Sequence, residues 1–214
     1  MTQASPILLI GCGALAREIM AVLRKSRWDG IEVQCLPAKL HNTPQLIPDA
    51  VRTKIREARA RFERIFVLYG DCGTGGLLDA VLAEEGVERI AGAHCYEFFA
   101  GSVDFAALAE DEPGSFFLTD FLARHFDRLI IKGLGIDRHP ELLPLYFGNY
   151  KRVVYLAQTR SAKHLAAARA AALRLGLAFE HRFTGYGDLE ESIRALGESA
   201  AGLTNQAMAA STGT

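Results

Sequence analysis

Two hydrophobic patterns alternate along nearly the whole chain. Short runs rich in β-branched and large apolar residues predict strands, and apolar residues at helical spacing predict helices between them. We expect strands over 7–10, 31–36, 65–69, 89–91, 116–118, 129–131, 153–156 and 177–180. We expect helices over 14–25, 49–63, 77–85, 142–147, 162–175 and 189–196. This alternation is typical of an α/β fold with a largely parallel sheet.

Parts of the chain resemble one another. Residues 7–13 read as a strand, a cysteine between small residues and the start of a helix, and residues 66–73 open in the same way. In both stretches the next cysteine follows 23 residues after the first. A third stretch beginning at residue 129 has the same order of elements without cysteines. We interpret these as three related β-α-β-α units of about 60 residues, and equal spacing by chance is the alternative.

The domain boundaries follow from this interpretation. The units span 6–63, 64–127 and 128–198 within one α/β domain over residues 1–198. The last stretch, 199–214, consists mostly of small residues with little to bury. We therefore predict a flexible tail there.

Composition excludes several classes of protein. The chain has 24 basic and 25 acidic side chains and a net charge of −1, so no overall field attracts nucleic acid. No apolar run approaches the roughly 20 residues of a membrane span, and the first residues carry no basic secretory segment. We expect a cytoplasmic protein that binds neither nucleic acid nor membranes, and whose partner is a small-molecule substrate.

The four cysteines give the main chemical signal. Each lies at or just beyond the carboxyl end of a predicted strand, and the carboxyl ends of parallel strands form the edge where ligands bind. We predict a thiolate site for a soft metal, either zinc or an iron–sulfur cluster, with Cys12, Cys35, Cys72 and Cys95 as ligands. His94 can replace one thiolate. The alternative is that each cysteine packs as a small buried hydrophobe.

Two loops at the same edge carry candidate substrate-binding residues. Lys39, His41 and Asn42 follow Cys35 in a polar loop suited to a carboxylate or phosphate. The glycine-rich loop 70–76 follows a strand and opens a helix, where backbone N–H groups favour an anion, and Thr74 adds a hydroxyl. If no metal is bound, the chain is instead a small-molecule binding protein that holds an anionic ligand on this loop.

Proton transfer has two candidates, Glu97 and His94, in an aromatic stretch after a predicted strand. Glu97 can equally cap the helix that follows. A nicotinamide dinucleotide site is not expected, because Ala16 stands at the third glycine position of the fingerprint.

Four stretches together are similar to one known family. Residues 35–42, 69–76, 92–98 and 116–121 resemble the domain-of-unknown-function family DUF1638. The resemblance implies a setting in one-carbon or corrinoid-linked metabolism, with a methyltransferase or corrinoid protein as partner. The chain lacks the Asp-x-His-x-x-Gly loop of corrinoid carriers.

A second likeness concerns architecture alone. Three α/β units around a shared cysteine site are similar to quinolinate synthase, which holds an iron–sulfur cluster, but here two units carry paired cysteines and the third has none. Zinc and iron both remain open, and we favour an iron–sulfur cluster slightly over zinc. The sequence as a whole predicts a metal-dependent enzyme or enzyme accessory, in the former case a transferase or lyase.

Overall fold

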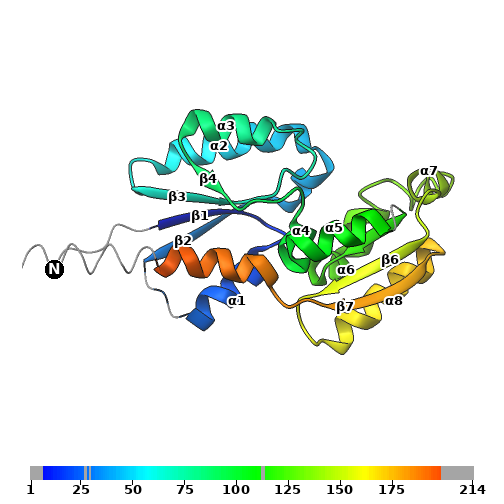
Figure 1. Cartoon of the computed structure of the whole chain (residues 1–214). Coiled ribbons are helices and arrows are strands. Elements are labelled where there is room, and N and C mark those ends of the chain that lie inside the picture. The colour runs from blue at the N-terminus through cyan, green and yellow to red at the C-terminus, as the bar shows by residue number, and fades with distance from the viewer. Residues whose placement is uncertain (1–6, 27, 29, 112–113, 199–214) are drawn as a thin grey trace, which may run out of the picture. The chain divides into compact units, whose positions relative to one another are not determined.

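The computed structural model describes residues 7–26, 28, 30–111 and 114–198 (Figure 1). These residues form two compact units. Unit 1 contains the described residues of 7–93 together with 189–198, and unit 2 contains those of 94–188. Every strand pair is parallel, which confirms the predicted α/β class. The strands divide between a four-stranded and a three-stranded sheet, so three equal repeats are not shown. The predicted tail, 199–214, lies outside the described residues.

Unit 1 is built on a four-stranded sheet in the order β2-β1-β3-β4. Its strands are β1 (Ile7–Cys12), β2 (Ile31–Leu36), β3 (Arg64–Leu68) and the short β4 (Glu88–Arg89). Its helices are α1 (Ala16–Ser26), α2 (Ile47–Ala58) and α3 (Leu77–Glu85), with two 3₁₀ helices (Ala38–Asn42 and Pro44–Leu46) after β2 and a helical stretch over 189–198. In Figure 1, α2 and α3 cover one face of this sheet, and α1 and the helical stretch 189–198 cover the other.

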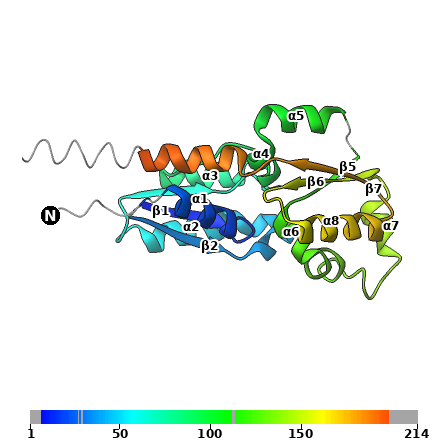
Figure 2. The same ribbon diagram turned by 90° about the horizontal axis from the view of Figure 1, so that it is seen from below.

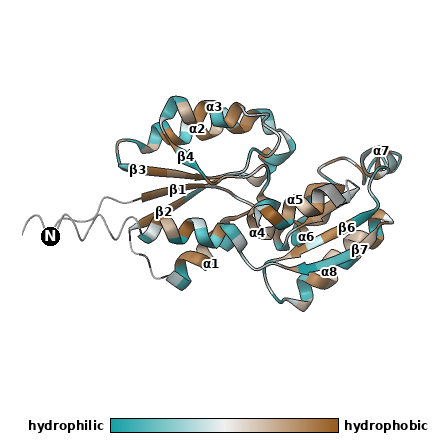
Figure 3. Cartoon of the chain, in the orientation of Figure 1, coloured by the Kyte–Doolittle hydropathy of each residue, from teal (hydrophilic) through white to brown (hydrophobic). Residues whose placement is uncertain are grey.

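The alternation of side chains along β1 explains these two layers. Leu8 and Ile10 belong to the core beneath α2 and α3, where they join Ile55 and Leu78. Gly11 faces the other way, since a Cβ there would come within 2.8 Å of Ile19 on α1. Both faces of β1 are therefore buried, which is why the strand reads as a continuous apolar run, brown in Figure 3.

Unit 2 has a three-stranded sheet in the order β5-β6-β7. Its strands are β5 (Ser115–Leu118), β6 (Arg152–Ala157) and β7 (Ala178–Phe183). Its helices are α4 (Cys95–Ala100), α5 (Ser102–Asp111), α6 (Asp120–Phe126), a π-helix (Asp127–Ile131), α7 (Leu142–Phe147) and α8 (Ala162–Leu175). Figure 2 shows α5 and α8 on opposite faces of the sheet. Phe117 contacts Phe105 on the α5 face, whereas its neighbour Phe116 contacts Phe147 of α7 on the other.

The predicted strand over 129–131 is wrong. Those residues form the end of a π-helix that continues directly from α6, with Ala123, Phe126 and Ile131 buried along it. A three-residue apolar run is too short to show whether its period is that of a strand or a helix. By contrast, the predicted helices 77–85, 142–147 and 162–175 coincide with α3, α7 and α8.

Membrane insertion by a helix has no support in the part of the chain that the structure describes. None of the helices there is both long and apolar enough to cross a bilayer.

Candidate functional site

Three of the four cysteines lie at the carboxyl edge of the unit 1 sheet. Cys12 is the last residue of β1, Cys35 lies opposite Gly11 near the end of β2, and Cys72 lies in the loop after β3. Cys72 is a member of the core beneath α2 and α3, and Cys12 packs against that core. Cys95 is the first residue of α4 and belongs to unit 2. Three of the four cysteines therefore share one edge of the unit 1 sheet, and whether they act as metal ligands stays a prediction.

The hydroxyl of Tyr69 lies among these thiols. Tyr69 is 2% exposed, and no group in the described part of the chain forms a hydrogen bond of ordinary geometry with its buried hydroxyl oxygen. The thiol of Cys12, a weak partner, faces it. Burial raises the pKa of Tyr69, and negative charge on Cys12, Cys72 or Cys35 raises it further. A buried hydroxyl without a strong partner is an unmet polar group, and it marks this edge as incomplete.

The thiols influence one another. Burial raises the pKa of Cys12, and burial together with the nearby Cys12 raises the pKa of Cys35. Both side chains are therefore protonated thiols at neutral pH. A bound cation would reverse this, since a metal ion favours the thiolate over the thiol.

Strand geometry keeps these thiols from forming a finished ligand set. The Cys35 sulfur lies on the face of Gly11, 3.8 Å from where a Cβ of Gly11 would be, whereas the next residue, Cys12, points to the opposite face. Within the described residues, no three or more His, Cys, Asp or Glu side chains are grouped so that they could hold a metal ion. The thiols are close to one another but not assembled.

Cys72 has an unusual backbone. Its φ of 50° makes it the one described residue other than glycine with positive φ, a conformation that costs roughly 1–2 kcal/mol for a residue with a Cβ. The amide of Cys72 donates to the carbonyl of Ala93 at 2.8 Å, which helps to hold it there. Strained backbone of this kind concentrates at functional sites, so the strain favours a role for this thiol beyond packing.

The glycine-rich loop holds the carboxylate of its own residue Asp71. The carboxylate of Asp71 accepts hydrogen bonds from the hydroxyl of Thr74 and from the amides of Gly75 (3.1 Å) and Gly76 (2.9 Å). Burial alone would raise the pKa of Asp71, but these hydrogen bonds and nearby Arg89 outweigh it and lower the pKa. The amides of Gly75 and Gly76 are thus already occupied, and an external anion would first have to displace the Asp71 carboxylate from them.

The predicted substrate loop lies at the same edge. Lys39, His41 and Asn42 are exposed residues of the first 3₁₀ helix after β2. The second 3₁₀ helix begins at Pro44, which lies 3.6 Å from where a Cβ of Gly73 would be. The structure therefore brings this polar loop against the glycine-rich loop, next to the thiols.

The predicted proton-transfer residues belong to unit 2. His94 precedes α4 as its N-cap residue without a side-chain capping bond, and its ring centroid lies 6.3 Å from that of Tyr96. The ring of Tyr96 in turn lies 5.6 Å from Phe117. Glu97, one residue further along α4, is half-buried. The aromatic surroundings that the sequence suggested are present around this helix.

A second polar cluster, none of whose members is among the predicted site residues, lies at the carboxyl edge of the unit 2 sheet. Asp120, two residues after the end of β5, is buried and is contacted by Tyr155 of β6, Thr159 of the following loop and His164 of α8. The available signal was the position of Asp120 and Thr159 just beyond two adjacent strand ends.

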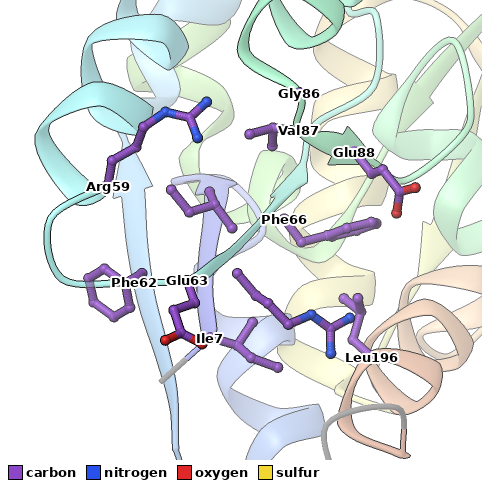
Figure 4. Close-up of a pocket in the computed structure, with 11 residues that line it drawn as sticks. Ile7, Arg59, Phe62, Glu63, Phe66, Gly86, Val87, Glu88 and Leu196 are labelled. Atoms are coloured by element: carbon purple, nitrogen blue, oxygen red, sulfur yellow. The ribbon is translucent and has the colours of Figure 1, made fainter. Parts of the chain in front are cut away.

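A pocket of 250 Å³ lies at the opposite, amino edge of the unit 1 sheet (Figure 4). Ile7, Arg64 and Glu88, each the first residue of its strand, line it together with Leu196. None of the predicted site residues contributes to this pocket.

The comparisons with known proteins identify a family. A search of curated proteins gives no match. The family model for a protein of unknown function, DUF1638, matches residues 35–193, a range that includes Cys35, Cys72 and Cys95 and begins after Cys12. The match covers well over half of the chain. As its motifs indicated, this protein belongs to the DUF1638 family.

Proposed function

We propose that the chain is a metal-dependent enzyme or enzyme accessory whose unit 1 binds a soft metal through Cys12, Cys35 and Cys72. The observation that supports this best is the buried hydroxyl of Tyr69, which lacks a strong hydrogen-bond partner and has these three thiols around it. Packing alone explains a single buried cysteine. It does not explain three cysteines around an unsatisfied hydroxyl when Cys35 is exposed, Cys12 is half-buried and the buried Cys72 has a strained backbone.

The chemistry of the ligands limits which metal fits. Thiolates select zinc and iron–sulfur clusters over hard cations such as Mg²⁺ or Ca²⁺. We favour an iron–sulfur cluster and keep zinc as the second candidate. Cys12 and Cys35 lie on opposite faces of the sheet, so a shared metal requires the backbone at the ends of β1 and β2 to rearrange on binding.

The number of protein ligands decides the role of the metal. Three thiolates leave one coordination position open, so that the metal can polarise or activate a substrate. A fourth thiolate from Cys95 would close the site and make it structural or electron-transferring. In the open case, we expect Lys39, His41 and Asn42, exposed in the 3₁₀ helix after β2, to bind a substrate carboxylate or phosphate.

Metal analysis of protein purified without air tests the proposal. We expect near-stoichiometric iron or zinc, with visible absorption if the metal is an iron–sulfur cluster. Single Cys→Ser changes at positions 12, 35 and 72 should each remove most of the metal, while fluorescence of Trp28 shows that unit 1 is still folded. Metal-free protein, or a metal content that these changes leave unaltered, would refute the proposal.

The Cys95→Ser variant separates the two forms of the site. Retained metal indicates an open site built in unit 1 alone, and lost metal indicates that Cys95 is a fourth ligand. The zinc or iron content of Tyr69→Phe, measured in the same way, shows whether the phenol of Tyr69 contributes to metal binding.

The corrinoid-linked setting that the family resemblance implies suggests a protein partner. We propose that a methyltransferase or corrinoid protein is the partner of this chain, which would supply or receive a one-carbon group. Co-purification of tagged full-length chain from cells grown with and without cobalamin tests this, with the Cys72→Ser variant as the control that lacks the metal.

A further inference from the structure

The carboxyl edge of the unit 2 sheet holds a buried carboxylate with a full set of donors. Asp120, the first residue of α6, is 1% exposed. Its Oδ1 accepts from the hydroxyl of Tyr155 at 2.5 Å and from the amide of Gln158 at 3.2 Å. Its Oδ2 faces the hydroxyl of Thr159 and Nδ1 of His164, the latter at 3.1 Å. Four donors compensate for the desolvation of one buried negative charge.

This arrangement selects one tautomer of His164. A carboxylate only accepts hydrogen bonds, so the imidazole presents its N–H at Nδ1, and in the neutral ring Nε2 carries the lone pair. Within the described residues Nε2 has no hydrogen-bond partner, and the side chain is 18% exposed. The backbone is fixed as well, because the amide of His164 donates to the N-cap hydroxyl of Ser161 at 3.3 Å.

Tyr155 serves as a permanent donor in this cluster. Burial raises its pKa, and its hydrogen bond to Asp120 raises it further. The phenol therefore keeps its proton throughout the physiological range and holds the carboxylate in place. The side chain with a free nitrogen to exchange a proton is His164.

A structural role alone does not account for the imidazole. The loops after β5 and β6 are already tied together, because the side-chain oxygen of Gln158 accepts from the amide of Asp120 at 2.8 Å and its side-chain nitrogen donates to the carbonyl of Leu156 at 2.6 Å. His164 adds one ring nitrogen bound to the carboxylate and one directed away from it. That is the geometry of an oriented general base rather than of a cap.

The same edge carries a cation suited to a planar anion. Arg160 follows Thr159 in the loop after β6, and its guanidinium lies 4.0 Å from the ring centroid of Phe183, at the end of β7. Arg160 is exposed and forms no ion pair with any described acidic residue. A guanidinium stacked on a ring keeps its N–H edge available for a carboxylate or phosphate.

We propose that unit 2 contains an acid–base site in which His164, positioned by Asp120, moves a proton of a small anionic molecule that Arg160 binds through its carboxylate or phosphate group. The proton comes from a hydroxyl or thiol of that molecule. Its O–H or S–H bond breaks, an N–H bond forms at Nε2, and the oxygen or sulfur keeps the electron pair as an alkoxide or thiolate. The positive charge of the imidazolium then faces Asp120, and when the N–H bond at Nε2 breaks again the proton returns to that oxygen or sulfur.

Nuclear magnetic resonance of the full chain with isotope-labelled histidine tests this, with inorganic phosphate as the probe. We expect the ring nitrogens of His164 to report a proton on Nδ1, and we expect phosphate to shift its resonances saturably. Arg160→Gln should weaken phosphate binding about tenfold, the loss that follows removal of a charge-assisted hydrogen bond. Lys151→Gln, which removes an exposed positive charge at the amino end of β6, should leave binding unchanged.

Chemical modification gives a second readout. Diethyl pyrocarbonate should react at His164, and phosphate should slow that reaction. His139 is the internal control, because it is an exposed histidine paired with Glu141 at 3.1 Å and its reaction should not respond to phosphate. Asp120→Asn should move part of the His164 population to the tautomer with the proton on Nε2.

Two results would overturn the proposal. One is a wild-type His164 whose proton resides on Nε2, a measurement that needs no variant and therefore does not depend on Asp120→Asn folding. The other is phosphate binding that Arg160→Gln and Lys151→Gln weaken equally. Neither result affects the thiolate proposal for unit 1, which concerns different residues.

Discussion

Replacement of Tyr155 by Phe tests the energetics of the Asp120 cluster. The change removes one hydroxyl that donates to a buried carboxylate at 2.5 Å, and it leaves a ring that is 0% exposed with its volume unchanged. The stacking of this ring on His181, at 5.4 Å between centroids, is kept. Because the lost hydrogen bond has a charged acceptor, we expect unit 2 to lose about 1.5–3 kcal/mol of stability.

Tyr69→Phe is the matched control in unit 1. Tyr69, the residue after β3, is also buried, but only the Cys12 thiol faces its hydroxyl. A buried hydroxyl without a strong partner costs its desolvation free energy, and Tyr69→Phe removes that cost. In metal-free protein the change should therefore alter the free energy of unfolding by less than about 0.5 kcal/mol or increase it. The same atom is deleted in both variants, and only its surroundings differ.

Urea unfolding distinguishes the two variants. Trp28 is the single tryptophan of the chain and lies in unit 1, so its fluorescence follows that unit, while circular dichroism follows the helices of both. With a slope of about 1–3 kcal/mol per molar urea, Tyr155→Phe should lower the midpoint seen by circular dichroism by about 1 M. Equal midpoint shifts for Tyr155→Phe and Tyr69→Phe would mean that the hydrogen bond from Tyr155 to Asp120 does not stabilise unit 2.

Three further predictions concern unit 1. A Cβ at Gly197 would overlap the indole of Trp28, so Gly197→Ala should cost about 1–3 kcal/mol, measured by Trp28 fluorescence during unfolding. Folding lowers the pKa of Asp71. Its contribution to stability is therefore complete above the pKa of the unfolded state and is lost as the pH falls through the pKa of the folded state. In acid unfolding, Asp71→Asn should start from a lower stability than the wild type, and its stability should depend less on pH below about 4. The exposed Cys35 should be alkylated before the half-buried Cys12. Because the pKa of Cys35 is raised above 9.0, the alkylation rate of Cys35 should still be increasing at pH 9.0. An alkylation rate that levels off near neutral pH would contradict this.

Local chemistry made several elements predictable. Helix α3 is bounded by Gly76 and Gly86, both in the left-handed region, so its limits can be read directly from the sequence. Strand β1 was equally clear because both of its faces are buried. The π-helix at Asp127–Ile131 was not, because it depends on packing of Phe126 and Ile131 against residues distant in sequence.

The division into two units was beyond local reasoning. The stretch 189–198 returns to the unit that ended near residue 93, and no pattern in the sequence indicates that return. The candidate site shows the same limit. Proximity of Cys12, Cys35 and Cys72 followed from their positions at strand ends, but the opposite directions of Cys12 and Cys35 follow from the register between β1 and β2, which sequence alone does not fix.

X-ray absorption at the edge of the metal present in anaerobically purified protein tests most directly whether sulfur atoms of unit 1 bind that metal. We expect sulfur scatterers at about 2.3 Å, and fewer of them after Cys72→Ser. A first shell made only of oxygen and nitrogen, the same in both proteins, would contradict it.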